Sequence, residues 1–225
     1  MSLAKLSKME LLAFKNALRL HYDSIELFKI RSYPSAYFLS ILAMEEYGKA
    51  EALGHYVFGI ETGDGVSEKD EEDFMDYIHR GHRWKQVWFL HNRGPFYKKY
   101  QRHDLFQSKF IKNVLDGDME SLKHNSVYVG LRKDKKGKVL LNSKLVDPVK
   151  ISKIKAKHQI TVFNNNLIDW SLGLYIGKYG HDNEEIRRIL TRKLAKKLSV
   201  LWSIKDEKME KFLERYNELG YKGLL

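Results

Sequence analysis

The sequence of 225 residues has no cysteine and only three prolines. The lack of cysteine excludes disulfide bonds, thiolate metal ligands and a cysteine nucleophile, so the available chemistry is that of Glu, Asp, His, Lys and Tyr. No uncharged apolar run reaches the length of about 18 residues that a membrane span needs. The N-terminus carries early charges and has no apolar block before a small-residue cleavage site, so we expect no secretory signal and a cytoplasmic protein.

The scarcity of proline and of turn clusters predicts a mainly α fold, because both would interrupt helices. The spacing of apolar residues and the helix-start signals predict a bundle of four elements. These are a helix over 3–30, a second from Pro34 to about Ile60, a third over 67–90 with a bend at Gly81, and a shorter helical piece over 104–115.

The segment 125–142 is different, because two short β-like runs, SVYVGLR and KVLLN, flank the turn-rich KDKKG. This pattern predicts a small β-hairpin or an extended arm. Asp147 and Pro148 are typical of the cap and first position of a helix, which we expect to reach about Tyr179. A last helical region is expected over 184–219. We predict a single domain overall, made of a helical bundle core (1–124), a basic hairpin or arm (125–147) and C-terminal helices that pack on the same bundle (148–225).

Positive charge is concentrated in two stretches of the chain, which has a net charge of +11. Residues 123–157 include eleven basic and two acidic side chains, and residues 187–197 include six basic and no acidic ones. Such a surface favours a polyanion such as nucleic acid, or an acidic partner, although a solvated lysine-rich face remains the alternative. The candidate RNA-contacting residues are Lys123, Tyr128, Arg132, Lys133, Lys135, Lys136, Lys138, Arg187, Arg188 and Arg192.

The segment AMEEYGKAEALGH places charges in an otherwise apolar helix. On a helical wheel, Glu45, Glu46 and Lys49 share one side with Phe38 and Tyr56. An unpaired carboxylate in such a setting costs several kcal/mol. We therefore expect Glu45 or Glu46 to pair with Lys49 or with a cation on another helix.

The third predicted helix turns His82 and Lys85 toward its own apolar side. The inward charged groups of the two helices can pair most simply if the two helices pack together, so we predict one polar cluster. Its members are Glu45, Glu46, Lys49, His82 and Lys85. Two interpretations stay open: a buried ion-pair network that holds two helices in register, or a polar cleft in which His82 transfers protons while Lys49 and Lys85 hold an anion.

Metal and nucleotide sites have weaker support in the sequence. His79 with His82, and Glu51 with His55, have helical spacings that could chelate a metal, but the Glu-x-x-His pairs of a di-iron oxidase bundle do not occur. Neither the P-loop spacing nor GxGxxG is present. We therefore expect no metal and no cofactor, and a metal-dependent oxidase is the weakest hypothesis.

Three segments carry a recognisable set of motifs. In SAYFLSILAMEEYGKAEAL, small and apolar residues lead into Glu-Glu-x-x-Lys; HRWKQ contains His-x-x-Lys; and LKHNSVYVGL contains Lys-x-x-Ser-x-Tyr-Val. In type, order and approximate spacing these motifs resemble the AbiV-type abortive-infection proteins, a branch of the HEPN superfamily. The likeness covers roughly Lys15 to Leu131.

The resemblance implies a HEPN-like helical bundle that forms a homodimer and serves antiviral defence in bacteria or archaea. It also implies a metal-independent endoribonuclease or toxin that impairs translation, with RNA and a phage-encoded activator protein as partners and no membrane. The usual superfamily motif, an Arg followed by a His after four to six intervening residues, does not occur; Lys49 and His55 come nearest. In place of that motif, the AbiV-like pattern offers a candidate catalytic set: Glu45, Glu46, Lys49, His82 and Lys85. The alternative is a non-catalytic interaction protein that binds RNA or a phage protein.

Overall fold

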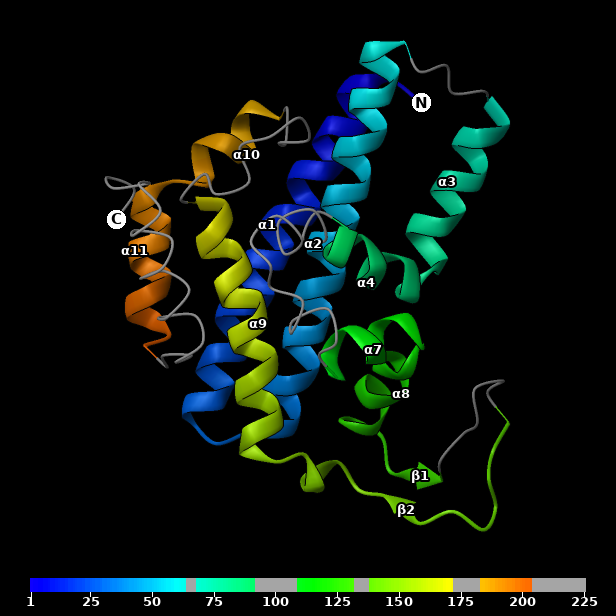
Figure 1. Cartoon of the computed structure of the whole chain (residues 1–225), viewed down its shortest axis with the longest axis vertical. Helices are drawn as coiled ribbons and strands as arrows, with labels where there is room; N and C mark the ends of the chain where they lie inside the picture. Colours follow the sequence, from blue (N-terminus) through cyan, green and yellow to red (C-terminus); the bar gives the residue numbers. More distant parts are fainter. Residues whose placement is uncertain (64–67, 92–108, 132–137, 172–182, 204–225) are drawn as a thin grey trace.

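The computed structural model describes residues 1–63, 68–91, 109–131, 138–171 and 183–203 (Figure 1). Within these ranges the chain forms nine α-helices, a 3-10 turn and one two-stranded antiparallel sheet. The predicted mainly α fold with a small hairpin is therefore confirmed. None of the helices in these ranges combines the length and the apolar character that crossing a membrane requires.

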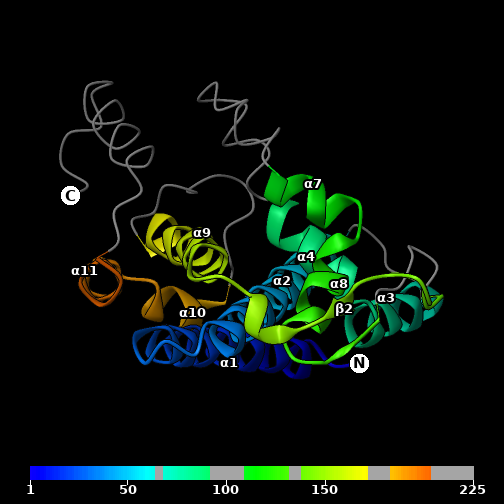
Figure 2. The same ribbon diagram turned by 90° about the horizontal axis from the view of Figure 1, so that it is seen from below.

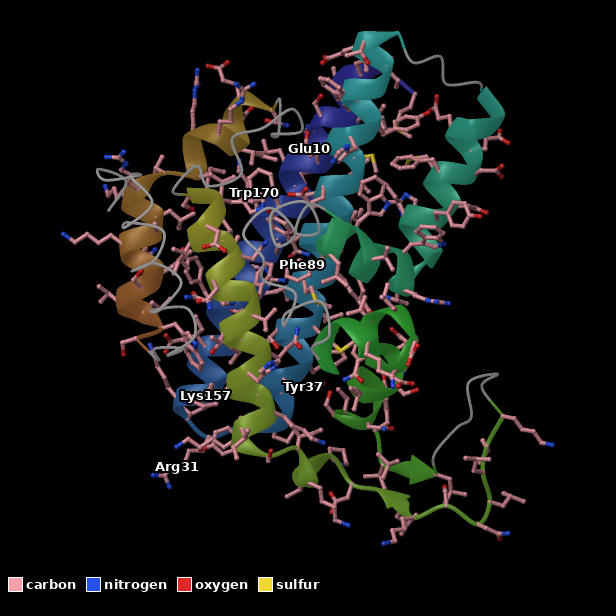
Figure 3. All side chains as sticks on the ribbon, viewed as in Figure 1. Glu10, Arg31, Tyr37, Phe89, Lys157 and Trp170 are labelled. Atoms are coloured by element: carbon pink, nitrogen blue, oxygen red, sulfur yellow. The ribbon has the colours of Figure 1, made fainter. Side chains whose placement is uncertain are left out.

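Two long helices, α1 (Leu3–Lys29) and α2 (Tyr33–Thr62), form a hairpin that supports the rest of the molecule. Pro34 lies in the first turn of α2, where its missing N–H is not needed, and Gly63 ends α2 in a left-handed conformation with φ of 80°. Figure 3 shows Arg31 at the tight connection between the two helices. Both helices match the predicted ranges within a few residues.

Helix α2 is the central element, because it contacts α1, α4 (His82–His91), α8 (Asp118–Asn125) and α9 (Lys153–Ser171). A helix that is covered on several sides needs no continuous polar face, which explains the apolar character of its sequence. The ring of Tyr47 lies 5.9 Å from that of Phe14, 6.0 Å from that of Phe89 and 5.7 Å from that of Phe163, centroid to centroid. These rings join four helices, and Figure 3 shows Phe89 near the middle of the bundle.

The predicted third helix is divided into two helices at Gly81, a sharper change than the bend that we expected. Helix α3 (Glu68–Arg80) ends there and α4 begins at His82. The amide of Gly81 still donates to the carbonyl of Tyr77, and its own carbonyl accepts from the amide of Lys85. Ile78 of α3 joins a small apolar cluster with Leu6 and Leu53, while α4 packs on the middle of α2.

The hairpin is present, but its predicted second strand is wrong. After α7 (Lys109–Leu115) and α8, strand β1 (Gly130–Leu131) pairs with β2 (Leu145–Val146), not with KVLLN at 138–142. This register buries Val146, which is 9% exposed, whereas Leu141 of the expected strand is 80% exposed. Burial of Val146 therefore favours this register.

The C-terminal helices begin and divide at other residues than predicted. Asp147 caps a 3-10 turn (Pro148–Lys150), and α9 begins only at Lys153. The region expected over 184–219 is divided into α10 (Glu184–Ile189) and α11 (Arg192–Leu201), because Thr191 caps a new helix. The parts of these two predictions at 172–179 and 204–219 lie outside the described residues. Trp202, just after α11, donates to Thr161 of α9 over 2.9 Å.

Helices α2 and α4 make a very close approach at Gly48. A Cβ atom at this position would lie 1.8 Å from the carbonyl oxygen of Lys85 and 3.1 Å from the amide nitrogen of Phe89. Both neighbours are backbone atoms, which cannot rotate away as a side chain would. Only glycine lets the two helices come this close.

We therefore expect Gly48→Ala to lower the free energy of unfolding by about 3 kcal/mol, because the two helices must separate to admit one methyl group. Gly59→Ala is the matched control in the same helix, since a Cβ atom there would meet no atom of another element within 4 Å. The control is expected to keep or raise stability by up to about 1 kcal/mol, as alanine favours helix. Urea denaturation measures both; equal midpoints would contradict the close approach.

Candidate active site

The carboxylate of Glu45 lies at the centre of a buried polar cluster. The residue is 2% exposed and accepts hydrogen bonds from two helices that pack on α2. From α4, His82 Nδ1 lies 2.9 Å from Oε2 and Gln86 Nε2 lies 2.8 Å from Oε1. From α8, Lys123 Nζ lies 3.0 Å from Oε1 and 3.3 Å from Oε2. The cluster therefore joins three helices through one side chain.

Local sequence explains how these donors converge. His82 and Gln86 are four residues apart, so both project from the same face of α4. Gly48, one turn after Glu45, brings that face against α2. Arg83 donates to the carbonyl oxygen of Leu115 over 2.6 Å, which fixes the end of α7 against α4 and places the following helix α8 beside the cluster.

The charge state of Glu45 follows from these contacts. Burial alone would raise the pKa of the carboxyl group, but the hydrogen bond from His82, the charge of Lys123 and the bond from Gln86 together lower it. Glu45 is therefore an anion at neutral pH. An anion held in this way fixes the orientation of the His82 ring through Nδ1.

Lys85 lies on α4 close to the same carboxylate and is 8% exposed. Burial lowers its pKa, and the nearby charges of Lys49 and Lys123 act in the same direction, while Glu45 and Glu46 oppose them. The charges of Glu45, Glu46 and Lys49 thus act on Lys85, and His82 joins this electrostatic neighbourhood through its hydrogen bond to Glu45. Their contacts differ, however, because Glu46 turns to α1, where it accepts from Asn16 Nδ2 over 3.1 Å.

The cluster extends onto α8 through residues that sequence reasoning did not select as catalytic. Lys123 Nζ also lies 2.8 Å from Glu120 Oε2, and Glu120 Oε1 lies 2.9 Å from His124 Nε2. The ring of His124 stacks on that of Tyr128, with centroids 5.7 Å apart. The i,i+3 and i,i+4 spacings within ESLKH were the available signal for Glu120 and His124, and the i,i+4 spacing in HRWKQ was that for Gln86.

The candidate RNA-contacting residues have different locations. Lys123 is 4% exposed, so its charge lies in the cluster and not on the surface where we expected it. Tyr128 and Lys138 are exposed near the hairpin, and Arg187, Arg188 and Arg192 are exposed on α10 and α11. Arg132, Lys133, Lys135 and Lys136 lie outside the described residues. Figures 1 and 2 place α10 and α11 on the side of the bundle away from α8 and the sheet. The first basic stretch also includes the exposed Lys153, Lys155 and Lys157 of α9, and α9 packs against α11, so the two stretches meet on these neighbouring helices.

Glu45, His82 and Glu120 could in principle hold a cation, because one ligand atom from each lies within 4.8 Å of the others. The ammonium group of Lys123, however, already lies 3.0 Å from Glu45 and 2.8 Å from Glu120. A metal ion at this point would be repelled by that ammonium. Glu45, His82 and Glu120 could therefore bind a metal ion only if the Lys123 side chain moved away from them.

Two other histidines have surroundings unlike that of His82. His21 is 0% exposed, its Nε2 lies 2.9 Å from Asn164 Oδ1, and burial lowers its pKa to about 4. It is thus a neutral core residue between α1 and α9. His55 packs on the ring of Trp88, with centroids 5.1 Å apart. Neither is among the side chains that bond to Glu45.

The Lys123–Glu45 ion pair yields a stability test. Lys123→Met removes the cation beside a carboxylate that is 2% exposed, so we expect a loss of about 3 kcal/mol in unfolding free energy at neutral pH. Adding Glu45→Gln should restore part of this loss, because a neutral amide needs no counter-charge. Lys112→Met, on the exposed face of α7, is the control and should change stability by less than about 0.5 kcal/mol. Similar urea midpoints for both methionine variants would show that the buried pair is not stabilising.

Comparison with known proteins places the chain in a family. The family model HEPN_AbiV, described as AbiV, matches residues 5–169, a range that contains nearly all of α1 to α9 and all of the cluster. No curated protein and no solved structure gives a significant match. The match extends well beyond the three motifs and covers more than half of the sequence. The chain therefore belongs to the AbiV family of HEPN-type abortive-infection proteins.

Proposed function

We propose that this protein is a metal-independent endoribonuclease that acts in phage defence by impairing translation. The observation that supports the proposal is the pair formed by Glu45 and His82. The imidazole is 47% exposed at its side chain, whereas the carboxylate that holds it over 2.9 Å is 3% exposed. A solvent-accessible imidazole oriented by a buried anion is suited to proton transfer near neutral pH.

The proposed reaction uses the 2′-hydroxyl of RNA as nucleophile. When His82 donates its Nδ1–H to Glu45, its Nε2 lone pair can remove the 2′-hydroxyl proton. The O2′–P bond then forms and the P–O5′ bond breaks, which leaves a 2′,3′-cyclic phosphate and a 5′-hydroxyl. Lys49 and Lys85 lie in the same electrostatic neighbourhood and would stabilise the negative charge that develops on phosphorus-bound oxygens.

The proposal includes partners and a location that fit this chemistry. RNA is the substrate, the protein acts in the cytoplasm as a homodimer, and a phage-encoded protein activates it. Exposed basic groups such as Lys138 and Arg188 support contact with the RNA backbone. Exposed apolar side chains of the hairpin region, including Val129 at 77% and Leu145 at 67%, support a protein contact.

A second candidate function is a non-catalytic interaction protein that binds RNA or a phage protein. It is favoured by the burial of four cluster residues, since Glu45, Lys85, Gln86 and Lys123 are each less than 9% exposed. A sealed ion-pair network can hold α2, α4 and α8 together with no catalytic role. This alternative assigns no role to His82, whose side chain is 47% exposed.

We expect His82→Ala to lower cleavage of total RNA by roughly 100-fold or more, because general acid–base transfer contributes on the order of 10²–10⁴. The melting temperature should change little, since Glu45 keeps its bonds to Gln86 and Lys123. His79→Ala, an exposed histidine of α3, is the matched control and should retain activity. EDTA should have no effect on the wild type.

Equal cleavage by the His82→Ala and wild-type proteins would contradict the role of His82. Loss of activity in EDTA would contradict the metal-independent mechanism. A wild type that folds but cleaves no RNA, even after addition of phage lysate, would favour the interaction protein.

A further inference from the structure

We propose that His124 is a second catalytic residue, which acts with His82 as the other half of an acid–base pair. The inference rests on the endoribonuclease function proposed above and adds a residue to the same site. It begins from a chain of contacts that runs from α4 through α2 to α8. In order, its members are His82, Glu45, Lys123, Glu120 and His124.

The two ends of this chain have similar distances, although His82 forms a hydrogen bond to Glu45 of another helix and His124 an ion-pair contact with Glu120 of its own helix. Each imidazole has one ring nitrogen 2.9 Å from a carboxylate oxygen, His82 Nδ1 from Glu45 and His124 Nε2 from Glu120. The ammonium of Lys123 lies between the two carboxylates, at 3.0 Å and 2.8 Å. The arrangement is thus a pair of carboxylate-bound imidazoles that share one internal cation.

Both imidazoles lie at the exposed side of the cluster. Their side chains are 47% and 58% exposed, while that of Lys123 is 5% exposed. A nitrogen of His82 and a carboxylate oxygen of Glu120 lie within 4.8 Å of each other, and the same carboxylate binds His124. Both rings therefore approach the Glu120 carboxylate, and the inference requires that one phosphodiester group reach both of them.

Cleavage of RNA by its 2′-hydroxyl needs two proton transfers, which a pair of histidines can supply. A neutral imidazole takes the proton of the attacking hydroxyl, and an imidazolium gives a proton to the 5′ oxygen as the P–O5′ bond breaks. After one turnover the two rings have exchanged protonation states, and no other reactant is consumed. A single histidine leaves the second transfer to water.

Other groups of the cluster are less suited to the second transfer. Lys85 and Lys123 are 8% and 4% exposed, and Lys123 is bound to two carboxylates. Tyr128 is 61% exposed and stacks on the His124 ring, so it restricts the orientation of that ring and offers an aromatic face beside the cleaved nucleotide. These contacts favour His124 as the partner of His82.

The test compares His124→Gln, His124→Ala and His82→Ala on an RNA oligonucleotide that the wild type cleaves. Glutamine keeps a polar side chain beside Glu120 but cannot transfer a proton. We expect both His124 variants to lose roughly 100-fold or more. His79→Gln, on α3, is the control and should cleave as the wild type does.

A matched oligonucleotide with sulfur in place of the 5′-bridging oxygen shows which histidine is the general acid. A thiolate leaves without being protonated, so this substrate does not need that acid. We expect this substrate to restore cleavage by the variants of one histidine but not by those of the other. Near wild-type cleavage by His124→Gln, with His82→Ala inactive, would overturn the inference and leave the proposed function intact. If the sulfur-substituted oligonucleotide is cleaved by neither the His82 nor the His124 variants, the inference is also wrong. If the folded wild type cleaves no RNA from which such an oligonucleotide can be chosen, the proposed function itself is refuted.

Discussion

The interaction on which the structure depends is the pairing of the Glu45 carboxylate inside a helix interface. A carboxylate that is 2% exposed keeps its charge only when donors replace the water that it has lost. His82, Gln86 and Lys123 supply those donors from α4 and α8, and this fixes how both helices meet α2. Gly48 permits α2 and α4 to approach this closely, because it has no Cβ atom to clash with the backbone of Lys85. Packing and charge are thus satisfied by the same arrangement.

The same pairing gives the site its chemical character. Lys123 forms ion pairs with two carboxylates at once, and each carboxylate lies 2.9 Å from a ring nitrogen of an imidazole whose side chain is about half exposed. His21 shows the contrast, because it is fully buried with an amide partner, and its pKa of about 4 keeps it neutral. The difference is an anionic partner combined with access to solvent.

Much of the fold and part of the site could be predicted from the sequence. The apolar spacing predicted α1 and α2 well, and the inward charges of Glu45 and His82 predicted that their helices meet. Lys123 was assigned to a basic surface, because its contact with Glu45 spans 78 positions in sequence and depends on how α8 packs. Strand β2 was misplaced for a similar reason, since its register is decided by burial of Val146. Local pattern determines elements, but long-range packing determines which charges meet.

The central claim is that this cluster promotes attack by a 2′-hydroxyl without a metal. The most direct test is cleavage of an RNA oligonucleotide in which one 2′-deoxynucleotide replaces the residue on the 5′ side of the cleaved bond. The proposed mechanism predicts that this change abolishes cleavage at that bond, and that the unmodified RNA yields a 2′,3′-cyclic phosphate and a 5′-hydroxyl. Cleavage of the deoxy-substituted bond, or products with a 5′-phosphate, would contradict it.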